Sequence, residues 1–343
     1  MGNAIAKIGG ALRPGDVVEV RSAAEILATL DANGALGALP FMPEMQKLAG
    51  SRFVVQQRAE KICDTVHYSG SERIADAVLL DAPRCDGSAH AGCQAECRLF
   101  WKDTWLRRVG HDDRPAATAS AVTAAALAAL IERNARQSPS AEGAERFRCQ
   151  ATELFAASER LSFWDPRAYL RVLTSGNVSI AHFVRIMVRA VVAEGLRKLG
   201  RRSDMPLVGM ASKSSPAAMP LGLQAGDRVT VKDRDGLART LNKNGQTRGL
   251  WFDREMLPFA GKTFTVRRRI TRFINDQNGE MIRLKTDCLT LEGVVCCGEN
   301  SSKRWFCPRG IYPYWRESWL ERGEAPAQAG LGEPERSRAE VRA

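Results

Sequence analysis

The sequence predicts a mixed α+β fold in which two duplicated, mostly β modules are separated by a helical insert. Three observations support this prediction: a long internal repeat, an alternation of apolar and polar residues at equivalent places in both copies, and an alanine-rich segment with helical spacing between them. At 343 residues, the chain is long enough for two or three domains whose cores need no disulfide bonds.

The internal repeat is a match between two segments of the chain that lie 211 residues apart. Gly15-Asp16 recurs as Gly226-Asp227, and the same offset holds without a gap as far as Gly87 and Gly298. Three residues are then inserted in the second copy, and the match continues as far as Arg108 and Arg322. A period this long indicates two domain copies rather than a solenoid of short units. The matched residues include Phe41 with Phe252, Glu44 with Glu255, Cys85 with Cys296, Cys93 with Cys307, Trp101 with Trp315, and Trp105 with Trp319.

Each copy is expected to be built mainly from strands. Asp16–Arg21 and Asp227–Lys232 alternate apolar and polar residues, which is the periodicity of a half-buried strand. Phe53–Arg58 and Phe264–Arg269 do the same further along each copy. Asn278-Gly279 is a strong hairpin signal in the second copy. Short helical or turn segments are expected between the first two strands of each copy.

The opening of each copy has the pattern Leu-x-x-Gly-Asp-x-Val-x-Val, from Leu12 to Val20 and from Leu223 to Val231. This pattern resembles the first strand of SH3-like small β-barrels, including the KOW-type modules of ribosome and RNA-polymerase partners. The resemblance covers only the opening strand of each copy and does not reach the cysteines. It implies that each module is a small SH3-like β-barrel, and it implies nothing about a substrate.

The segment between the copies differs from them in composition. Arg114–Pro139 is rich in alanine with helical spacing, and Glu145–Arg160 is a second helix candidate. Ser179 can N-cap a third helix that ends near Leu199. The expected division of the chain is a first module at 1–112, a helical insert at 113–205, a linker at 206–222, a second module at 223–322 and a disordered polar tail at 323–343.

The chain has nine cysteines, an odd number, and most of them fall into two groups. Clustered cysteines in a reducing compartment are more often metal ligands than disulfides. Four thiolates can close a tetrahedral zinc site or hold an iron–sulfur cluster. We therefore predict two metal sites, one in each module, with eight cysteines as candidate ligands. The first group is Cys63, Cys85, Cys93 and Cys97, and the second is Cys288, Cys296, Cys297 and Cys307.

Some residues near these groups leave alternatives open. His90 lies inside the first cysteine loop and is either a plain loop residue or an alternative ligand to Cys97. Cys149 stands alone between the groups, where a buried packing role is favoured. Cys63 and Cys288 do not align in the repeat, so the fourth ligand of each site is left undetermined.

Aromatic residues crowd both cysteine groups. Two tryptophans that are four positions apart would lie on one face of a helix. Each copy has such a pair, Trp101 with Trp105 and Trp315 with Trp319. The favoured interpretation is a helix that packs over the metal loop and shields it from water. The alternative is a platform on which bases or sugars stack.

Ala181–Leu199 has apolar residues at helical spacing with arginines mostly elsewhere, which predicts an amphipathic helix. Packing on the modules is favoured, and peripheral contact with a membrane is the less favoured alternative. The five charged residues in this stretch are too many for a transmembrane span. Because Met1–Gly10 lacks the features of a secretory signal, we expect a cytoplasmic protein.

The charge balance favours an anionic partner. Lys and Arg together number 50 against 39 for Asp and Glu, a net charge of +11 that suits nucleic acid or an acidic protein. Three function classes follow, in this order: a metal-stabilised binding or scaffold protein, an iron–sulfur redox protein or tailoring enzyme, and a nucleic-acid-associated protein. No catalytic set of residues is recognised, and the repeated Glu44 and Glu255 are interpreted as a shared packing or capping element.

Overall fold

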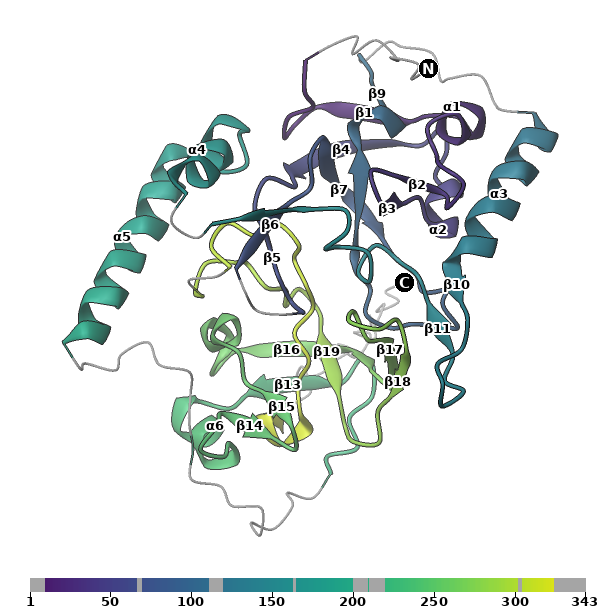
Figure 1. Ribbon diagram of the computed structural model, residues 1–343. Helices are drawn as coiled ribbons and strands as arrows, with labels where there is room; N and C mark the ends of the chain where they lie inside the picture. The colour runs from purple at the N-terminus through teal and green to yellow at the C-terminus, as the bar shows by residue number, and fades with distance from the viewer. Residues whose placement is uncertain are drawn as a thin grey trace, which may run out of the picture.

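The computed structural model describes residues 10–66, 70–110, 120–162, 165–199, 209, 220–301 and 304–323. These residues form several small antiparallel sheets together with helices (Figure 1). The predicted mixed α+β class is therefore confirmed. Nearly all of the predicted tail at 323–343 and most of the predicted linker at 206–222 lie outside the described residues.

The first module contains a five-stranded sheet. Its strands are β1 (Val17–Val20), β4 (Arg52–Arg58), β7 (Ala77–Arg84), β8 (Arg98–Lys102) and β9 (Leu106–Arg108). They lie in the order β8-β7-β4-β1-β9, and every neighbouring pair is antiparallel. Along β1, Val18 and Val20 are completely buried, as the alternation of apolar residues predicts. Glu19 between them is buried as well, contrary to a half-buried strand, because it pairs with Arg52 and Arg107.

The second module contains a corresponding four-stranded sheet. Residues that match in the repeat also have matching strand partners: Val18 pairs with Phe53, and Val229 pairs with Phe264. Neither sheet closes into a barrel among the described residues, so the predicted SH3-like barrels are not confirmed. The second sheet has the order β19-β16-β13-β20 and is made of β13 (Arg228–Val231), β16 (Thr263–Arg269), β19 (Leu289–Leu291) and β20 (Leu320–Arg322).

An aromatic cluster recurs at the centre of each module. Phe41 lies edge-on to Trp105 with ring centroids 5.1 Å apart, and the equivalent rings of the second module are 5.2 Å apart. All four tryptophans of the two predicted pairs are completely buried, which leaves no ring free to stack on a base. The predicted helical face is wrong. Trp101 lies in β8, where pairing with β7 keeps the backbone extended, and Trp105 lies in the 3₁₀ helix η1 (Asp103–Trp105).

Shorter elements complete the two modules and the insert. Ser22 caps the first short helix by accepting a hydrogen bond from the amide of Glu25. The short helices are α1 (Ala23–Leu27), α2 (Pro43–Gln46), α6 (Arg234–Thr240), η2 (Arg254–Phe259) and η3 (Glu317–Trp319). The small ladders are β2 (Ala35–Leu36) with β3 (Leu39–Pro40), β10 (Arg136–Gln137) with β11 (Arg146–Phe147), β14 (Gln246–Thr247) with β15 (Leu250–Trp251), β17 (Arg272–Ile274) with β18 (Met281–Arg283), and β12 (Glu159–Leu161) with β6 (Ser71–Arg73) and β5 (Ile62–Cys63).

The insert contains the helices α3 (Ala121–Ala135), α4 (Pro166–Thr174) and α5 (Ile180–Lys198). Ser120 is the N-cap of α3, and its hydroxyl accepts a hydrogen bond from a backbone amide of the first turn. The helix predicted at Glu145–Arg160 is not formed, because this segment consists of turns and of residues that pair as β11 and β12. Since β12 pairs with β6 of the first module, tertiary pairing overrides the local helical spacing.

α3 packs into the first module. Leu127 and Ile131 are buried in the same hydrophobic core as Val18 and Val20 of β1. Figure 1 shows α3 along one side of the molecule, with α4 and α5 on the opposite side. The helical insert therefore contributes side chains to the first module's core.

We expect Leu127→Ala to lower the free energy of unfolding by about 2–5 kcal/mol, because truncation of a completely buried leucine leaves a cavity. Val122→Ala, on the solvent face of the same helix, is the control and should change it by less than about 0.5 kcal/mol. Urea denaturation followed by tryptophan fluorescence measures both. Equal midpoints for the two variants would show that α3 is not part of the core.

α5 confirms the helix predicted at Ala181–Leu199, and one of its faces packs on the second module. Phe183 stacks on Phe306 with ring centroids 5.0 Å apart, and Ile186 is buried in the same cluster. The side chains of Val184 and Val188 are exposed. Within the part of the chain that the structure describes, no helix is both long enough and apolar enough to cross a membrane.

Candidate metal centre

The first cysteine loop connects β7 to β8 and is closed by backbone hydrogen bonds. The amide of Cys85 donates to the carbonyl of Cys97 at 2.8 Å. Inside the loop, the amide of His90 donates to the carbonyl of Gly87 at 3.0 Å. The amide of Cys93 donates to the carbonyl of His90 at 3.1 Å. Gly87 has a φ of +72°, and a Cβ there would lie 2.0 Å from the Cys93 carbonyl oxygen, so only glycine fits. These turns fold the loop back so that His90 lies beside Cys85.

Glu44 of α2 meets Cys85 and His90 in the interior of the first module. The Cys85 thiol donates to Oε1 of Glu44 with a sulfur–oxygen distance of 2.8 Å. Nδ1 of His90 lies 4.0 Å from this sulfur and 3.8 Å from the same carboxylate oxygen. One sulfur, one nitrogen and one oxygen thus lie within 4.8 Å of one another. These three side chains could hold a metal ion.

Burial and the mutual contacts set the protonation of this group. Burial raises the pKa of the Cys85 thiol far above its usual range, and the nearby Glu44 carboxylate raises it further. Burial also lowers the pKa of His90, against the opposing effect of Glu44. At neutral pH the imidazole is therefore uncharged, and Cys85 keeps its proton. A metal ion would find the imidazole ready to coordinate and would have to displace one proton, that of Cys85.

Two polar atoms of the group are left without good hydrogen bonds. Oε2 of Glu44 is buried and has no hydrogen-bond partner. Nε2 of His90 is also buried without a hydrogen bond of good geometry. The backbone of Arg148 is nevertheless close enough to raise the pKa of the imidazole, against the larger effect of burial. An unpaired buried polar atom is unusual in a native protein, and a bound ion is one arrangement that gives it a partner. The donor set therefore fits a metal ion.

The equivalent place in the second module is built differently. Glu255 is buried there as well, but its carboxylate accepts hydrogen bonds from the amides of Asn300 and Ser301, each at 2.8 Å. The Cys297 thiol lies 3.3 Å from the same carboxylate. The position of His90 is occupied by Arg304, which pairs with Asp253. Backbone amides satisfy this carboxylate, and a guanidinium replaces the imidazole ligand.

The candidate cysteines do not gather into two groups of four. Among the described residues, no three of them lie as close together as the atoms of Glu44, Cys85 and His90 do. Instead, Cys63 of the first group meets Cys307 of the second group, with the amide of Cys63 donating to Sγ of Cys307 at 3.1 Å. The hydrogen bond with Cys307 lowers the pKa of Cys63, whereas burial raises that of Cys307.

Cys93, Cys97 and Cys149 lie near one another, but among the described residues they are not close enough to form a metal site. Cys93 is buried against Phe147 and Ile274, and Cys149 packs between this cluster and the first core, consistent with a packing role. Of the remaining four, Cys288 is buried, Cys97 and Cys296 are partly buried, and Cys297 is exposed.

Two members of the centre can be found from the sequence, and the third cannot. Cys85 is among the predicted ligands, and His90 is the alternative to Cys97. The sequence suggests a packing or capping role for Glu44, although its identity with Glu255 in the repeat marks it as shared. The available signal is that a buried glutamate needs a partner, but burial cannot be read from the sequence.

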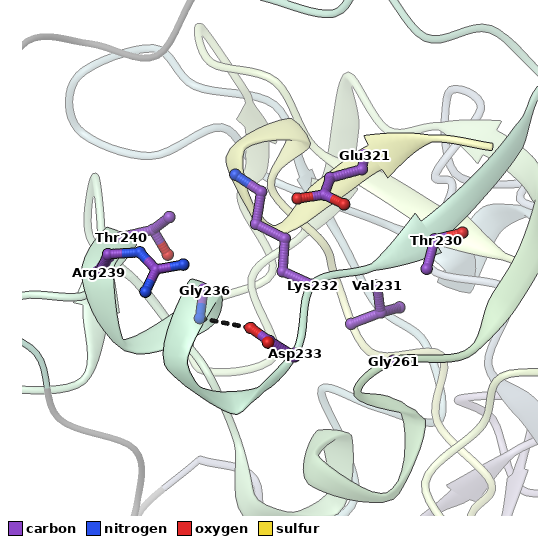
Figure 2. A pocket seen from close by; sticks show the side chains of 9 residues that line it. All are labelled: Thr230, Val231, Lys232, Asp233, Gly236, Arg239, Thr240, Gly261 and Glu321. Carbon is purple, nitrogen blue, oxygen red and sulfur yellow. Dashed lines mark hydrogen bonds between the residues drawn. The ribbon is translucent and has the colours of Figure 1, made fainter.

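A shallow pocket of about 380 Å³ lies on the second module, away from the predicted ligands (Figure 2). Its lining mixes charges, with Lys232 and Arg239 opposite in sign to Glu321. Figure 2 shows that Asp233, also in the lining, accepts a hydrogen bond from the amide of Gly236 at 2.7 Å. Asp233 is the N-cap of α6, so helix capping accounts for its place in the pocket.

The candidate centre thus consists of Glu44 from α2 and of Cys85 and His90 from the first cysteine loop. Its three donor atoms are of three chemical kinds, which restricts the ions that would bind there. Comparisons with protein-family models, with curated proteins and with solved structures found no match for this chain.

Proposed function

We propose that this chain is a metal-binding protein with a scaffold or binding role, and that Glu44, Cys85 and His90 hold one zinc ion in its first module. The observation that carries the proposal is the convergence of a carboxylate, a thiol and an imidazole within 4.8 Å, two of them buried. The unpartnered Oε2 of Glu44 supports it, because a cation would give that oxygen a partner.

The mixture of donor atoms favours zinc over other ions. Zinc accepts sulfur, nitrogen and carboxylate oxygen in one tetrahedral site. Magnesium and calcium prefer oxygen ligands alone, and iron–sulfur clusters are held mainly by thiolates. Three protein ligands leave a fourth position for water or a further ligand, as in catalytic zinc sites.

Charge neutralisation explains how a buried place could take a divalent ion. With zinc bound, the thiolate of Cys85 and the carboxylate of Glu44 together balance its two positive charges. The imidazole of His90 adds a neutral donor. The loaded centre therefore carries no net charge into the interior, which avoids the desolvation cost of an isolated ion.

We further propose that the two halves are copies of one module and that only the first keeps a complete ligand set. Matched hydrogen bonds support this. The amide of Cys85 donates to the Cys97 carbonyl, and the amide of Cys296 donates to that of Ile311, each at 2.8 Å. The second copy has Arg304 where the first has His90. The net charge of +11 makes an acidic protein or nucleic acid the expected partner of the assembled modules.

Titration of the metal-free chain with zinc should give one equivalent bound and about one proton released per ion. Because the pKa of Cys85 is raised and that of His90 is lowered, the released proton is the thiol's throughout neutral pH. The affinity should therefore rise about tenfold per pH unit, and this rise should continue past the ordinary thiol pKa of about 8.5. Calorimetry in buffers of different ionisation enthalpy measures both quantities.

His90→Ala should weaken zinc binding at least about tenfold, since it removes one of three ligands. Cys297→Ser, which alters the thiol beside Glu255, is the matched control and should leave the first affinity unchanged. Zinc binding that survives His90→Ala but is lost in Cys297→Ser would place the metal in the second module and contradict the proposal.

A further inference from the structure

The two cysteine loops exchange equivalent contacts across the boundary between the modules. Nζ of Lys61 donates to the carbonyl of Trp305 at 2.9 Å, and Nη1 of Arg272 donates to that of Ala91 at 3.1 Å. Lys61 and Arg272 are equivalent in the repeat, and so are Ala91 and Trp305. In both directions, a cationic side chain of one module holds a loop carbonyl of the other. This reciprocity is the contact pattern of a two-fold interface.

The cysteines at this boundary follow the same reciprocity with one difference. Cys307 of the second loop enters the hydrophobic core of the first module, where the amide of Cys63 donates to its sulfur. Cys93 of the first loop packs against Ile274 of the second module. Cys93 is the equivalent of Cys307, and Ile274 is the equivalent of Cys63. An aliphatic side chain thus satisfies the packing on one side, so packing alone does not require Cys63 on the other.

We propose that Cys63 and Cys307 are a redox-active pair of thiols whose oxidation to a disulfide cross-links the two modules. The two residues are 244 positions apart in the chain, so their meeting depends on the folded interface. Both thiols are free in this structure.

The surroundings of the pair hold its two segments in place. Arg309 donates to the carbonyl of Cys63 at 3.0 Å and to the hydroxyl of Thr65 at 2.9 Å. Nζ of Lys61 donates to the hydroxyl of Ser71 and to the carbonyl of Trp305, at 2.9 Å each. The nearby cations, Lys61 and Arg309, disfavour a metal ion between the sulfurs and favour a thiolate as nucleophile.

Hydrogen peroxide is an oxidant that balances the reaction. The sulfur of Cys63 attacks one peroxide oxygen, the O–O bond breaks, and Cys63 becomes a sulfenic acid as water leaves. The sulfur of Cys307 then attacks the sulfenic sulfur, and its proton leaves with the hydroxyl group as a second water. Two thiols lose two electrons and two protons in total, and one peroxide is reduced to two waters.

The test treats the full-length, metal-free chain with hydrogen peroxide and maps its disulfides by mass spectrometry after non-reducing digestion. We expect a peptide in which Cys63 is joined to Cys307, its absence in Cys307→Ser, and its retention in Cys149→Ser. Oxidation of free cysteine in a parallel sample shows that the reagent is active, because burial raises the pKa of Cys297 to about 12 and makes this thiol a poor reporter. Failure of the pair to join while free cysteine reacts, or joining of Cys63 to Cys296 instead, overturns the proposal. A third outcome also overturns it: one equivalent of zinc protects both thiols from oxidation, and Cys307→Ser abolishes the zinc binding.

A second variant adds the missing thiol on the equivalent side. Ile274→Cys should allow Cys93 to form a second cross-link with the introduced thiol, because the two contacts are equivalent. The oxidised variant should then lose four thiols per chain at these positions where the wild type loses two. If the introduced thiol stays reduced while Cys63 and Cys307 join, the reciprocity that supports the proposal is wrong.

Discussion

Glu255→Gln is expected to lower the free energy of unfolding by about 2–3 kcal/mol, whereas the same change at Glu44 is expected to cost less than about 1 kcal/mol in the metal-free chain. Both oxygens of the Glu255 carboxylate are acceptors: Oε1 accepts from the amides of Asn300 and Ser301, and Oε2 accepts from the amide of Glu299 at 3.2 Å. A glutamine would turn its NH₂ group toward at least one of these donors. Oε2 of Glu44 has no hydrogen bond to lose.

The pair of substitutions separates stability from metal binding. Urea denaturation of both metal-free variants gives the first quantity, and zinc titration gives the second. Glu44→Gln should weaken zinc binding at least about tenfold, because a neutral amide is a poorer ligand than a carboxylate. Glu255→Gln should leave the affinity of the first module intact. The opposite pattern, with Glu44→Gln unstable and Glu255→Gln poor in zinc, would exchange the roles assigned to the two glutamates.

Gly87→Ala should destabilise the first module by about 3 kcal/mol and abolish zinc binding, since the new Cβ would meet the Cys93 carbonyl oxygen at 2.0 Å. To relieve this overlap the loop must open, and His90 then leaves Cys85. Thermal unfolding with and without zinc measures both effects.

Gly50→Ala is the matched control for Gly87→Ala. Its φ of +77° is nearly the same, but a Cβ there meets nothing within 4 Å. It should therefore report only the strain of the left-handed backbone, about 1 kcal/mol, with normal zinc binding. Equal losses for the two variants would show that the close approach inside the loop is unimportant.

The central strand of each module could be predicted because its apolar residues alternate, and the alternating valines are completely buried in both modules. The alternation along Asp16–Arg21 and its copy located the central strands, and the structure pairs them with their partners in equal register. Barrel closure could not be predicted in this way, since a short pattern fixes one strand and not the path of the sheet. The tryptophan spacing misled for a related reason. Residues four apart suit a helical face, but pairing of β8 with β7 decided the conformation of Trp101.

The site could be predicted only where its members are close in the chain. Cys85 and His90 lie in one loop, so their proximity follows from the sequence. Glu44 comes from a helix that reaches them only through the tertiary fold. The grouping of cysteines by position failed for the same reason, because Cys307 crosses to the first module and meets Cys63. A contact between residues this far apart in the chain depends on the tertiary fold, and no local pattern records it.

The entry of Cys307 into the first module's core also has a consequence for synthesis on the ribosome. Cys63 emerges 244 residues before Cys307, a delay of about 10–50 s at ordinary rates of translation. During that time the first module is a nascent domain with one of its core positions vacant and with Lys61 lacking the Trp305 carbonyl. The core of the first module is therefore completed only near the end of translation. A ribosome that stops before the second cysteine loop releases an N-terminal fragment that contains the whole first module but lacks the Cys307 side chain of its core.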